Sequence, residues 1–265
     1  MPSTNRLVEL FGLNGKTAVV TGGSRGIGFM IAQGLLEAGA DRVILSARKA
    51  EASAAAAEKL SRFGEAHSIP GDVSTPEGCA ALGAAISEIT DTVHILVNNA
   101  GATWGAPIDE YPSEGWDKVM NTNVRGVFQL TQVLLPHLRA AATDDDHARI
   151  INIGSVDGLK VPSMDSFAYG ASKAAVHHLT RHLAAKLGGD NITVNAIAPG
   201  PFESRMMAFA LADEAGAAAV AASVPMGRIG APDDMAGAAI YLASRAGAYL
   251  TGTVLPVSGG ISNIS

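Results

Sequence analysis

The sequence has little of several features that define whole classes of protein. Its 265 residues include one cysteine, Cys79, which can form neither an internal disulfide nor a thiolate metal cluster. No run of about 18 apolar residues is present to span a bilayer. The start lacks the basic segment followed by an apolar one that marks a secretory signal. We therefore expect no membrane span and a cytoplasmic, reducing location.

Positive charge is also scarce. The chain carries 19 Lys and Arg against 25 Asp and Glu, a formal net charge of −6, which argues against nucleic acid as a partner. Aromatic residues make up only 5%, whereas there are 30 glycines. Glycine suits backbone that must approach a ligand closely. With 48% hydrophobic and 17% charged residues, the chain has the composition of a folded globular protein.

Short β-rich tracts alternate with helical stretches along nearly the whole chain. Several tracts are unbroken apolar runs (AVV, VIL, ILV, IINI), typical of strands buried on both faces of a parallel sheet. No linker or repeat divides the chain, so we predict one Rossmann-type, doubly wound α/β domain over residues 1–265, a seven-stranded parallel sheet flanked by helices. The predicted strands are 16–21, 42–47, 66–70, 94–97, 149–153, 193–198 and 253–257. The predicted helices are 27–38, 51–63, 76–90, 114–140, 166–187, 204–223 and 232–244.

The first predicted strand ends in TGGSRGIG (21–28) and runs directly into a helix. The spacing G-x3-G-x-G provides a tight turn, a close backbone approach to a pyrophosphate, and a seat for it at a helix N-terminus. A glycine loop alone is often merely a turn, but its place after the first strand favours a dinucleotide site. The loop residues expected to bind are Gly22, Ser24, Arg25, Gly26, Ile27 and Gly28.

The end of the second predicted strand decides between NAD and NADP. An acidic residue there would hold the ribose 2′-hydroxyl, but the sequence reads LSAR (45–48), with no carboxylate. Arg48, with Arg25 from the glycine loop, favours a 2′-phosphate and therefore NADP(H). The alternative is that both are ordinary surface arginines. Asp72 and Val73, after the third strand, are expected at the adenine edge; otherwise Asp72 caps the next helix.

These motifs and their order resemble the short-chain dehydrogenase/reductase family. The resemblance runs from residue 16 to 260. It is carried by TGGSRGIG (21–28), GDV (71–73), NNAG (98–101), Asn123, IGSV (153–156), YGASK (169–173), APG (198–200) and SGG (258–260). It implies that Asn123, Ser155, Tyr169 and Lys173 form a catalytic tetrad. Further similarity, in IAQGLLEAGA (31–40), INIGSV (151–156) and VPMGR (224–228), points to the β-ketoacyl reductase branch.

The resemblance also implies the remaining site residues. Two positions depart from the family: Ser204 stands in place of a Thr that meets the nicotinamide carboxamide, and Ser258 in place of an Asp before the closing Gly-Gly. Residues 200–228 would form a substrate lid. Cofactor contacts are expected from Asn99, Ala100, Gly101, Tyr169, Lys173, Pro199, Gly200, Phe202 and Ser204. Substrate contacts are expected from Trp104, Phe202, Met206 and Met207.

Tyr169 and Lys173 are four residues apart on a predicted helix and therefore share one face. A neighbouring ammonium and an oxidised nicotinamide would lower the phenol's pKa, so that Tyr169 acts as general acid in reduction. Ser155 would hydrogen-bond the substrate oxygen, and Asn123 would anchor a water that relays protons to Lys173. In isolation each has a simpler interpretation: a surface Tyr–Lys pair, a turn cap, a helix-entry residue. Only their joint order favours catalysis.

Two histidines, His178 and His182, have the spacing of a zinc pair but no accompanying acid, so no metal site is expected. Family resemblance instead places the helices over 114–140 and 166–187 at an interface of a homotetramer or homodimer. The expected activity is NADPH-dependent reduction of a small-molecule carbonyl, in the β-ketoacyl branch an acyl thioester. A reductase or dehydrogenase for a steroid, quinone, sugar or small alcohol stays open, as does a non-catalytic NADP-sensing regulator.

Overall fold

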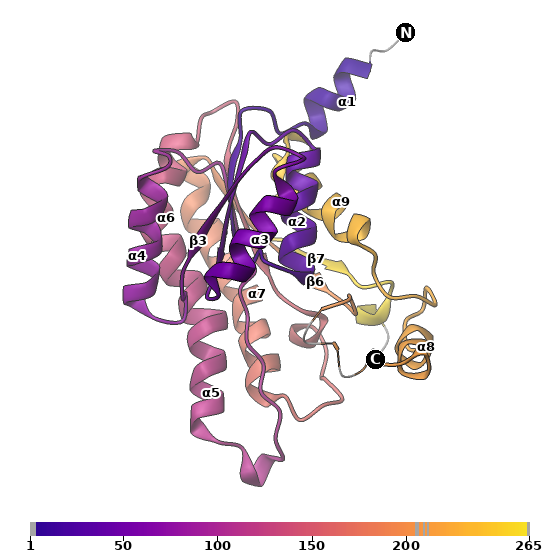
Figure 1. The fold of residues 1–265 in the computed structure, drawn as a ribbon. Helices are drawn as coiled ribbons and strands as arrows, with labels where there is room; N and C mark the ends of the chain where they lie inside the picture. Colours follow the sequence, from indigo (N-terminus) through magenta and orange to yellow (C-terminus); the bar gives the residue numbers. More distant parts are fainter. Residues whose placement is uncertain (1–3, 205–206, 209, 211, 264–265) are drawn as a thin grey trace.

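A computed structural model describes residues 4–204, 207–208, 210 and 212–263. Within them seven strands form one sheet in the order β3-β2-β1-β4-β5-β6-β7, and every neighbouring pair is parallel. The predicted fold class is confirmed (Figure 1). The strands are β1 (Thr17–Thr21), β2 (Arg42–Ala47), β3 (Glu65–Pro70), β4 (Ile95–Asn98), β5 (Ala148–Ile153), β6 (Ile192–Pro199) and β7 (Val254–Val257).

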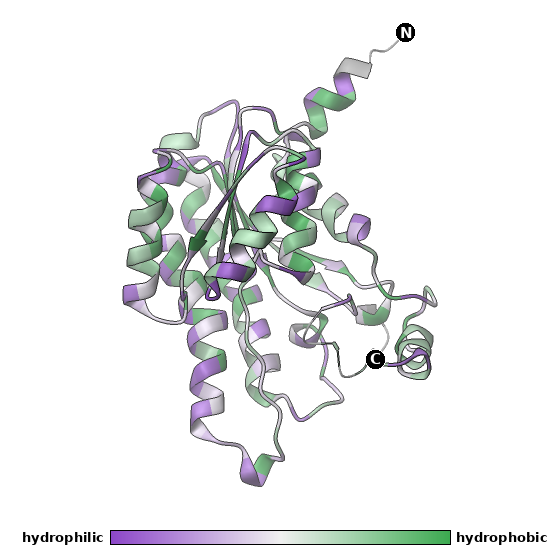
Figure 2. Cartoon of the chain, in the orientation of Figure 1, coloured by the Kyte–Doolittle hydropathy of each residue, from purple (hydrophilic) through white to green (hydrophobic). Residues whose placement is uncertain are grey.

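Helices cover both faces of the sheet because its strands are apolar on both sides. One core packs β1 residues Ala18 and Val20 against α2 (Gly26–Glu37), α3 (Ala50–Leu60) and α9 (Pro232–Ala243). The other packs Val19, which points the opposite way, against α4 (Pro76–Ser87), α6 (Gly126–Ala141) and α7 (Phe167–Leu187). Figure 2 shows the strands as a mostly hydrophobic centre between helices of mixed hydropathy. Ala18, Val19 and Val20 contribute to the two cores in turn because successive side chains of a strand point to opposite faces of the sheet.

Three helical segments differ from the prediction. The helix expected over 114–140 is two helices, α5 (Ser113–Met120) and α6, joined by η2, a π-helical turn over Asn121–Arg125. Over the expected 204–223, the described residues contain only α8 (Glu214–Ala222), which starts where the Asp213 carboxylate accepts from the Gly216 amide. The third is α1 (Thr4–Phe11), in a stretch where no helix is predicted. Short 3-10 turns occur at 108–110, 156–158, 188–190, 245–247 and 261–263.

The strand order reverses between β1 and β4, which lie side by side at the middle of the sheet. Loops that follow neighbouring strands on either side of such a reversal leave a crevice at the carboxyl edge of the sheet. The motifs that follow β1, β4, β5 and β6 therefore meet at one edge of the sheet.

Candidate active site

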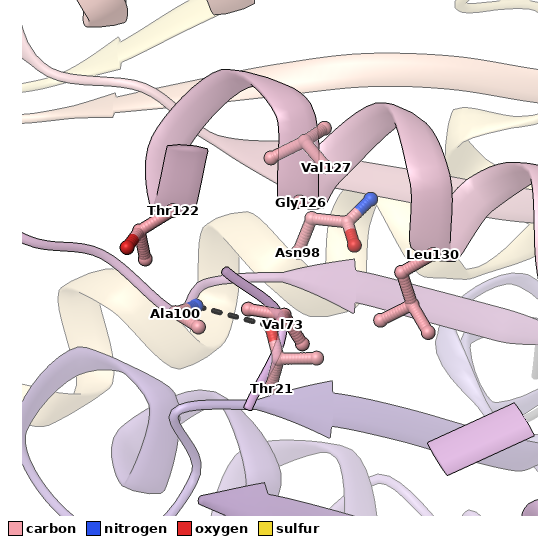
Figure 3. Close-up of a pocket in the computed structure, with 8 residues that line it drawn as sticks. All are labelled: Thr21, Val73, Asn98, Ala100, Thr122, Gly126, Val127 and Leu130. Atoms are coloured by element: carbon pink, nitrogen blue, oxygen red, sulfur yellow. Dashed lines mark hydrogen bonds between the residues drawn. The ribbon is translucent and has the colours of Figure 1, made fainter. Parts of the chain in front are cut away.

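The glycine loop after β1 is tied to the NNAG segment after β4. The Thr21 hydroxyl oxygen accepts from the main-chain amides of Asn99 and Ala100, both at 3.0 Å; Figure 3 shows the second contact. The Asn99 side-chain amide donates to the main-chain oxygens of Thr21, at 2.8 Å, and Gly22, at 3.2 Å. The two loops thus form one cross-linked unit at the crevice.

Glycine is required at three positions of this loop. Gly22 and Gly26 have φ of 66° and 53°, a region that disfavours other residues. A Cβ on Gly28 would overlap the Asn99 side-chain nitrogen and approach the Gly22 oxygen. The loop leads into α2, whose first-turn amides have no partners in the helix and suit a phosphate. Ser24 and Ile27 lie within this cradle, half-buried.

The two arginines expected at the 2′-phosphate are both exposed. Arg25 directly precedes α2, and Arg48 follows β2. Burial raises the pKa of Asp72, but the Ser74 amide, the Ser74 hydroxyl and the Arg48 guanidinium together lower it below its usual value. Arg48 is therefore within electrostatic reach of Asp72, as expected if both border the adenosine end of a nucleotide. The Asp72 carboxylate also accepts from Ser74 at 3.0 Å, and Val73 is buried beside Thr21 in a small pocket (Figure 3).

Three of the four expected catalytic residues lie together where α7 meets the end of β5. The buried Lys173 ammonium donates to the Ile153 main-chain oxygen at 2.7 Å and lies 5.5 Å from the Tyr169 ring centroid. The Ser155 hydroxyl lowers the pKa of the Tyr169 phenol, and its oxygen accepts from the Asp157 amide at 3.1 Å. Phenol, hydroxyl and ammonium therefore share one small space.

The pKa values of Tyr169 and Lys173 are set mainly by burial. Burial raises the pKa of Tyr169 to about 12, with Ser155 lowering it and the Asp157 carboxylate raising it. Burial lowers the pKa of Lys173 to about 8, opposed by Asp157. The expected lowering of the phenol's pKa by the lysine is thus not produced by the protein alone. Asp157, whose own pKa is raised by burial, is a nearby charge that the sequence argument missed.

Asn123, the fourth expected residue, lies buried in the π-helical turn. Its side-chain oxygen accepts from the Ala102 amide at 2.8 Å, and its side-chain nitrogen donates to the Ala102 oxygen and the Ser172 hydroxyl, both at 2.9 Å. The Ser172 hydroxyl in turn donates to the Tyr169 main-chain oxygen at 2.7 Å. Both amide hydrogens of Asn123 are therefore used in contacts with Ala102 and Ser172.

Residues after β6 close the other side of the crevice. The Gly200 amide donates to the Val257 oxygen at 2.9 Å, and a Cβ on Gly200 would lie 2.9 Å from the Cα of Ser258. The chain therefore packs closely with serine in place of the family's aspartate. A Cβ on Gly26 would lie 3.5 Å from that of Ser204, so the start of the expected lid lies against the glycine loop. Pro199 is buried at the end of β6, and Gly101 is exposed after NNAG.

The expected substrate residues are not gathered at one point. Trp104 packs on Gly115 of α5, with the Lys118 ammonium 5.1 Å from a ring centroid. Phe202 is buried against Gly230 and lines a cavity of about 230 Å³ with, among others, Met226, Arg228 and Asp234. Met207 is half-buried, and Met206 lies outside the described residues.

The histidines of α7 divide sharply by burial. His178 and His182 are exposed, and the described residues contain no cluster of three or more His, Cys, Asp or Glu able to hold a metal. His177 is buried beside Ser155, and the sequence argument passed over it. Its only sequence signal was the spacing of four residues from Lys173 and eight from Tyr169.

No helix in the described part of the chain is long and apolar enough to cross a membrane.

Comparison with known proteins identifies full-length relatives. The family described as enoyl-(acyl carrier protein) reductase matches residues 22–262. A rhamnolipids biosynthesis 3-oxoacyl-[acyl-carrier-protein] reductase from Pseudomonas aeruginosa is 53% identical over 250 residues, 94% of this chain and 97% of that protein. A gluconate 5-dehydrogenase from Gluconobacter oxydans is 36% identical, covering 96% of this chain and 97% of the relative.

Among solved structures, the Pseudomonas aeruginosa RhlG/NADP active-site complex superposes with a TM-score of 0.93 at 52% identity, covering 96% of this chain and 99% of that one. The expected similarity to the NADPH-dependent β-ketoacyl reductase branch is confirmed by these relatives, one of which is named for rhamnolipid biosynthesis.

Proposed function

The chain belongs to the short-chain dehydrogenase/reductase family, and from this premise we propose that it reduces the ketone of a 3-oxoacyl thioester to the hydroxyacyl product with NADPH. The observation that carries the substrate class is the full-length relationship to a 3-oxoacyl reductase. The lysine, phenol and serine gathered at the end of β5 supply the means of protonating a carbonyl oxygen.

The residues present fit NADP(H). Gly22, Gly26 and Gly28 leave space for a pyrophosphate at the start of α2, and Arg25 and Arg48 provide two guanidiniums with no acidic residue at the end of β2. Ser24, Ile27, Asp72, Val73, Asn99, Ala100 and Gly101 border this part of the site. On the nicotinamide side are Tyr169, Lys173, Pro199, Gly200, Phe202 and Ser204.

NADPH, when bound, supplies the hydride, and the chain supplies orientation and the proton. Ser155 hydrogen-bonds the substrate oxygen as negative charge develops there, and Tyr169 transfers its phenolic proton to that oxygen. A pKa of about 8 keeps most of Lys173 protonated at pH 7. Its ammonium then stabilises the phenolate that Tyr169 leaves behind. Asn123 holds Ser172, and through it the first turn of α7, in place.

The acyl chain would extend from this centre under residues 200–228, the proposed lid of the single domain. Phe202 and Met207, with Met206 by sequence, provide apolar surface there, and each CH₂ buried on binding contributes up to about 0.8 kcal/mol. Trp104, the other expected substrate residue, packs on Gly115 of α5. A carrier-bound or coenzyme A-bound 3-oxoacyl chain is the proposed small-molecule partner.

We also propose a homotetramer or homodimer built on α5–α6 and α7. Trp116 of α5 and Phe128 of α6 expose 42% and 45% of their surface, and a partner subunit packed on these helices would cover them. Sedimentation at micromolar concentration tests this. A monomer would contradict it.

The activity is tested by following NADPH oxidation with a panel of 3-oxoacyl thioesters of increasing length, diketones, quinones, steroids and keto-sugar acids. We expect kcat/KM to be highest for a 3-oxoacyl thioester of medium length. A higher value for a sugar acid or a quinone would move the enzyme to that substrate class. Tight NADPH binding without turnover of any carbonyl would instead support an NADP-sensing regulator.

A further inference from the structure

Strand β5 extends past the end of its neighbour β4. Main-chain N–H and C=O groups at and just after the end of β5 therefore have no hydrogen-bond partners on β4. The Arg149 amide donates to the His94 oxygen at 2.8 Å. The main-chain N–H and C=O groups of the odd-numbered residues of β5 therefore point toward β4. The last residue of β4 in register is Asn98, opposite Asn152. The Ile153 oxygen and the Ser155 amide point to the same side, beyond the end of β4. Buried groups of this kind need partners.

Two successive turns of α7 provide those partners. Lys173 donates to the Ile153 oxygen at 2.7 Å. One turn later, Nε2 of His177 accepts from the Ser155 amide at 3.4 Å. The main-chain N–H of Gly154, between them, points to the opposite side and donates to the Ile197 oxygen of β6 at 2.7 Å. The segment that carries the Ser155 hydroxyl is therefore held on one side by a strand and on the other by two α7 side chains.

The turn after β5 is shaped around the imidazole. A Cβ on Gly154 would overlap the His177 Nε2, and one on Gly158 would lie 2.9 Å from its Cε1. His177 itself is only 2% exposed. Gly154 thus leaves the room that the ring occupies, whereas a Cβ on Gly158 would first meet the α7 main chain, 2.6 Å from the Lys173 carbonyl carbon and 2.7 Å from the Ala174 nitrogen.

We propose that His177 is a positioning residue for the reaction: by accepting the Ser155 main-chain N–H it fixes the direction in which the Ser155 hydroxyl meets the substrate oxygen. This inference rests on the proposed carbonyl reductase function. The contact of His177 is with the Ser155 main-chain N–H, so His177 acts on the reaction through Ser155.

A neutral imidazole is the form that this contact requires, because a protonated ring has no acceptor nitrogen. Burial lowers the pKa of His177 to about 4. Lys173 and Arg181 lower it as well, and the Gly158 main chain raises it. With Nε2 accepting, the ring hydrogen is on Nδ1, which has no hydrogen-bond partner among the described residues. The contact that the ring makes within hydrogen-bond distance is therefore the one at Nε2.

Three variants separate positioning from packing. His177→Leu fills the space but removes the acceptor, and His177→Gln restores an acceptor oxygen near the Nε2 position. His178→Leu is the matched control, because it makes the same change at the exposed neighbour. We expect His177→Leu to lower kcat roughly 10- to 100-fold with the NADPH Kd unchanged. His177→Gln should recover most of the loss, and His178→Leu should match the wild type.

Hydrogen exchange of the peptide spanning 153–158, measured with NADPH bound, gives a second readout that needs no substrate. Faster exchange of the Ser155 amide in His177→Leu, slowed again in His177→Gln, supports the proposal. Wild-type kcat in His177→Leu, or equal loss of kcat in both variants with a parallel loss of NADPH binding, would overturn it. If the wild-type enzyme reduces no carbonyl, the proposed function fails, and unchanged exchange at Ser155 would separately remove the role of His177.

Discussion

The Lys173 ammonium nitrogen lies 2.7 Å from the main-chain oxygen of Ile153, so the buried charge of α7 is anchored on the strand that carries the serine. This contact compensates in part for burying the ammonium, whose pKa falls to about 8. It also fixes how far α7 can move along β5, and therefore where Tyr169, one turn earlier on the same face, meets Ser155.

Replacing Tyr169 by Phe removes the proton donor and little else. We expect kcat to fall at least about 100-fold, the range for loss of a general acid, while the NADPH Kd changes little. Steady-state kinetics and nucleotide fluorescence titration measure the two quantities. Tyr249→Phe, which makes the same change at a fully exposed position, is the control. A Tyr169→Phe enzyme with near-normal kcat would rule out this mechanism.

Replacing Arg48 by Asp should erode or reverse the preference for NADPH over NADH. The new carboxylate, close to that of Asp72, repels a 2′-phosphate and offers an acceptor to a 2′-hydroxyl. Loss of a charge-assisted hydrogen bond predicts a rise of about 10- to 100-fold in the NADPH KM. Lys59→Asp, an equal charge change on the exposed surface of α3, should leave the ratio of kcat/KM values unchanged. An unaltered ratio in Arg48→Asp would contradict the assignment of Arg48.

The parts of the site whose geometry could be predicted from the sequence are those that depend on neighbouring residues. The glycine loop needs positive φ values at Gly22 and Gly26 and free space at Gly28. These requirements appear in the sequence as glycines at a fixed spacing within one short segment. Tyr169 and Lys173 meet because they are one helical turn apart. Unbroken apolar runs mark buried strands wherever they occur, so the sheet could be predicted strand by strand.

What the sequence could not reveal depends on how elements pack. His177 accepts from the Ser155 amide only because β5 extends past the end of β4. That difference in length depends on the register between segments that are distant in the sequence. The pKa of Tyr169 rises rather than falls because burial dominates at that position, and burial is a property of the assembled fold. The π-helical turn at Asn123 has no known pattern in a single sequence. It is fixed instead by the contacts that Asn123 makes with Ala102 and Ser172.

The burial of His177 predicts a pH dependence of stability. Its pKa is about 4 in the folded protein against an ordinary value near 6.5, so as the pH falls from 6.5 to 4 the unfolded chain gains a proton that the folded one does not. The free energy of unfolding should therefore fall across this window, by roughly 2 kcal/mol from this group.

Urea unfolding at pH 7 and pH 4.5 measures this decrease, and His177→Gln should show a smaller one. Glu65 and Asp234, whose pKa values are about 2 in the folded protein, lose their contribution mainly below this window. They therefore affect both proteins alike. Equal decreases in the wild type and the variant would contradict the prediction.

The last prediction concerns how the acyl chain is presented. Acyl carrier proteins are strongly acidic, so a surface that docks them should be basic. On α6 and the turn before it the fixed positive charges are Arg125 and Arg139, and the Arg139 guanidinium is already paired with the Asp190 carboxylate at 2.7 and 2.9 Å. Arg125, with Arg181 of α7, is exposed, but two such residues on a protein of net charge −6 form a weak patch.

We therefore expect coenzyme A thioesters to be reduced at least as readily as carrier-protein thioesters. The measurement is kcat/KM for one 3-oxoacyl chain on each carrier, at low and high salt, for the wild type and for Arg125→Glu. Salt screens interactions between exposed charges. Because the basic patch is too weak to hold a carrier protein, the coenzyme A and carrier-protein values should respond similarly to salt and to the substitution. A large preference for carrier protein that is lost at high salt and in Arg125→Glu would show instead that this face is a docking site.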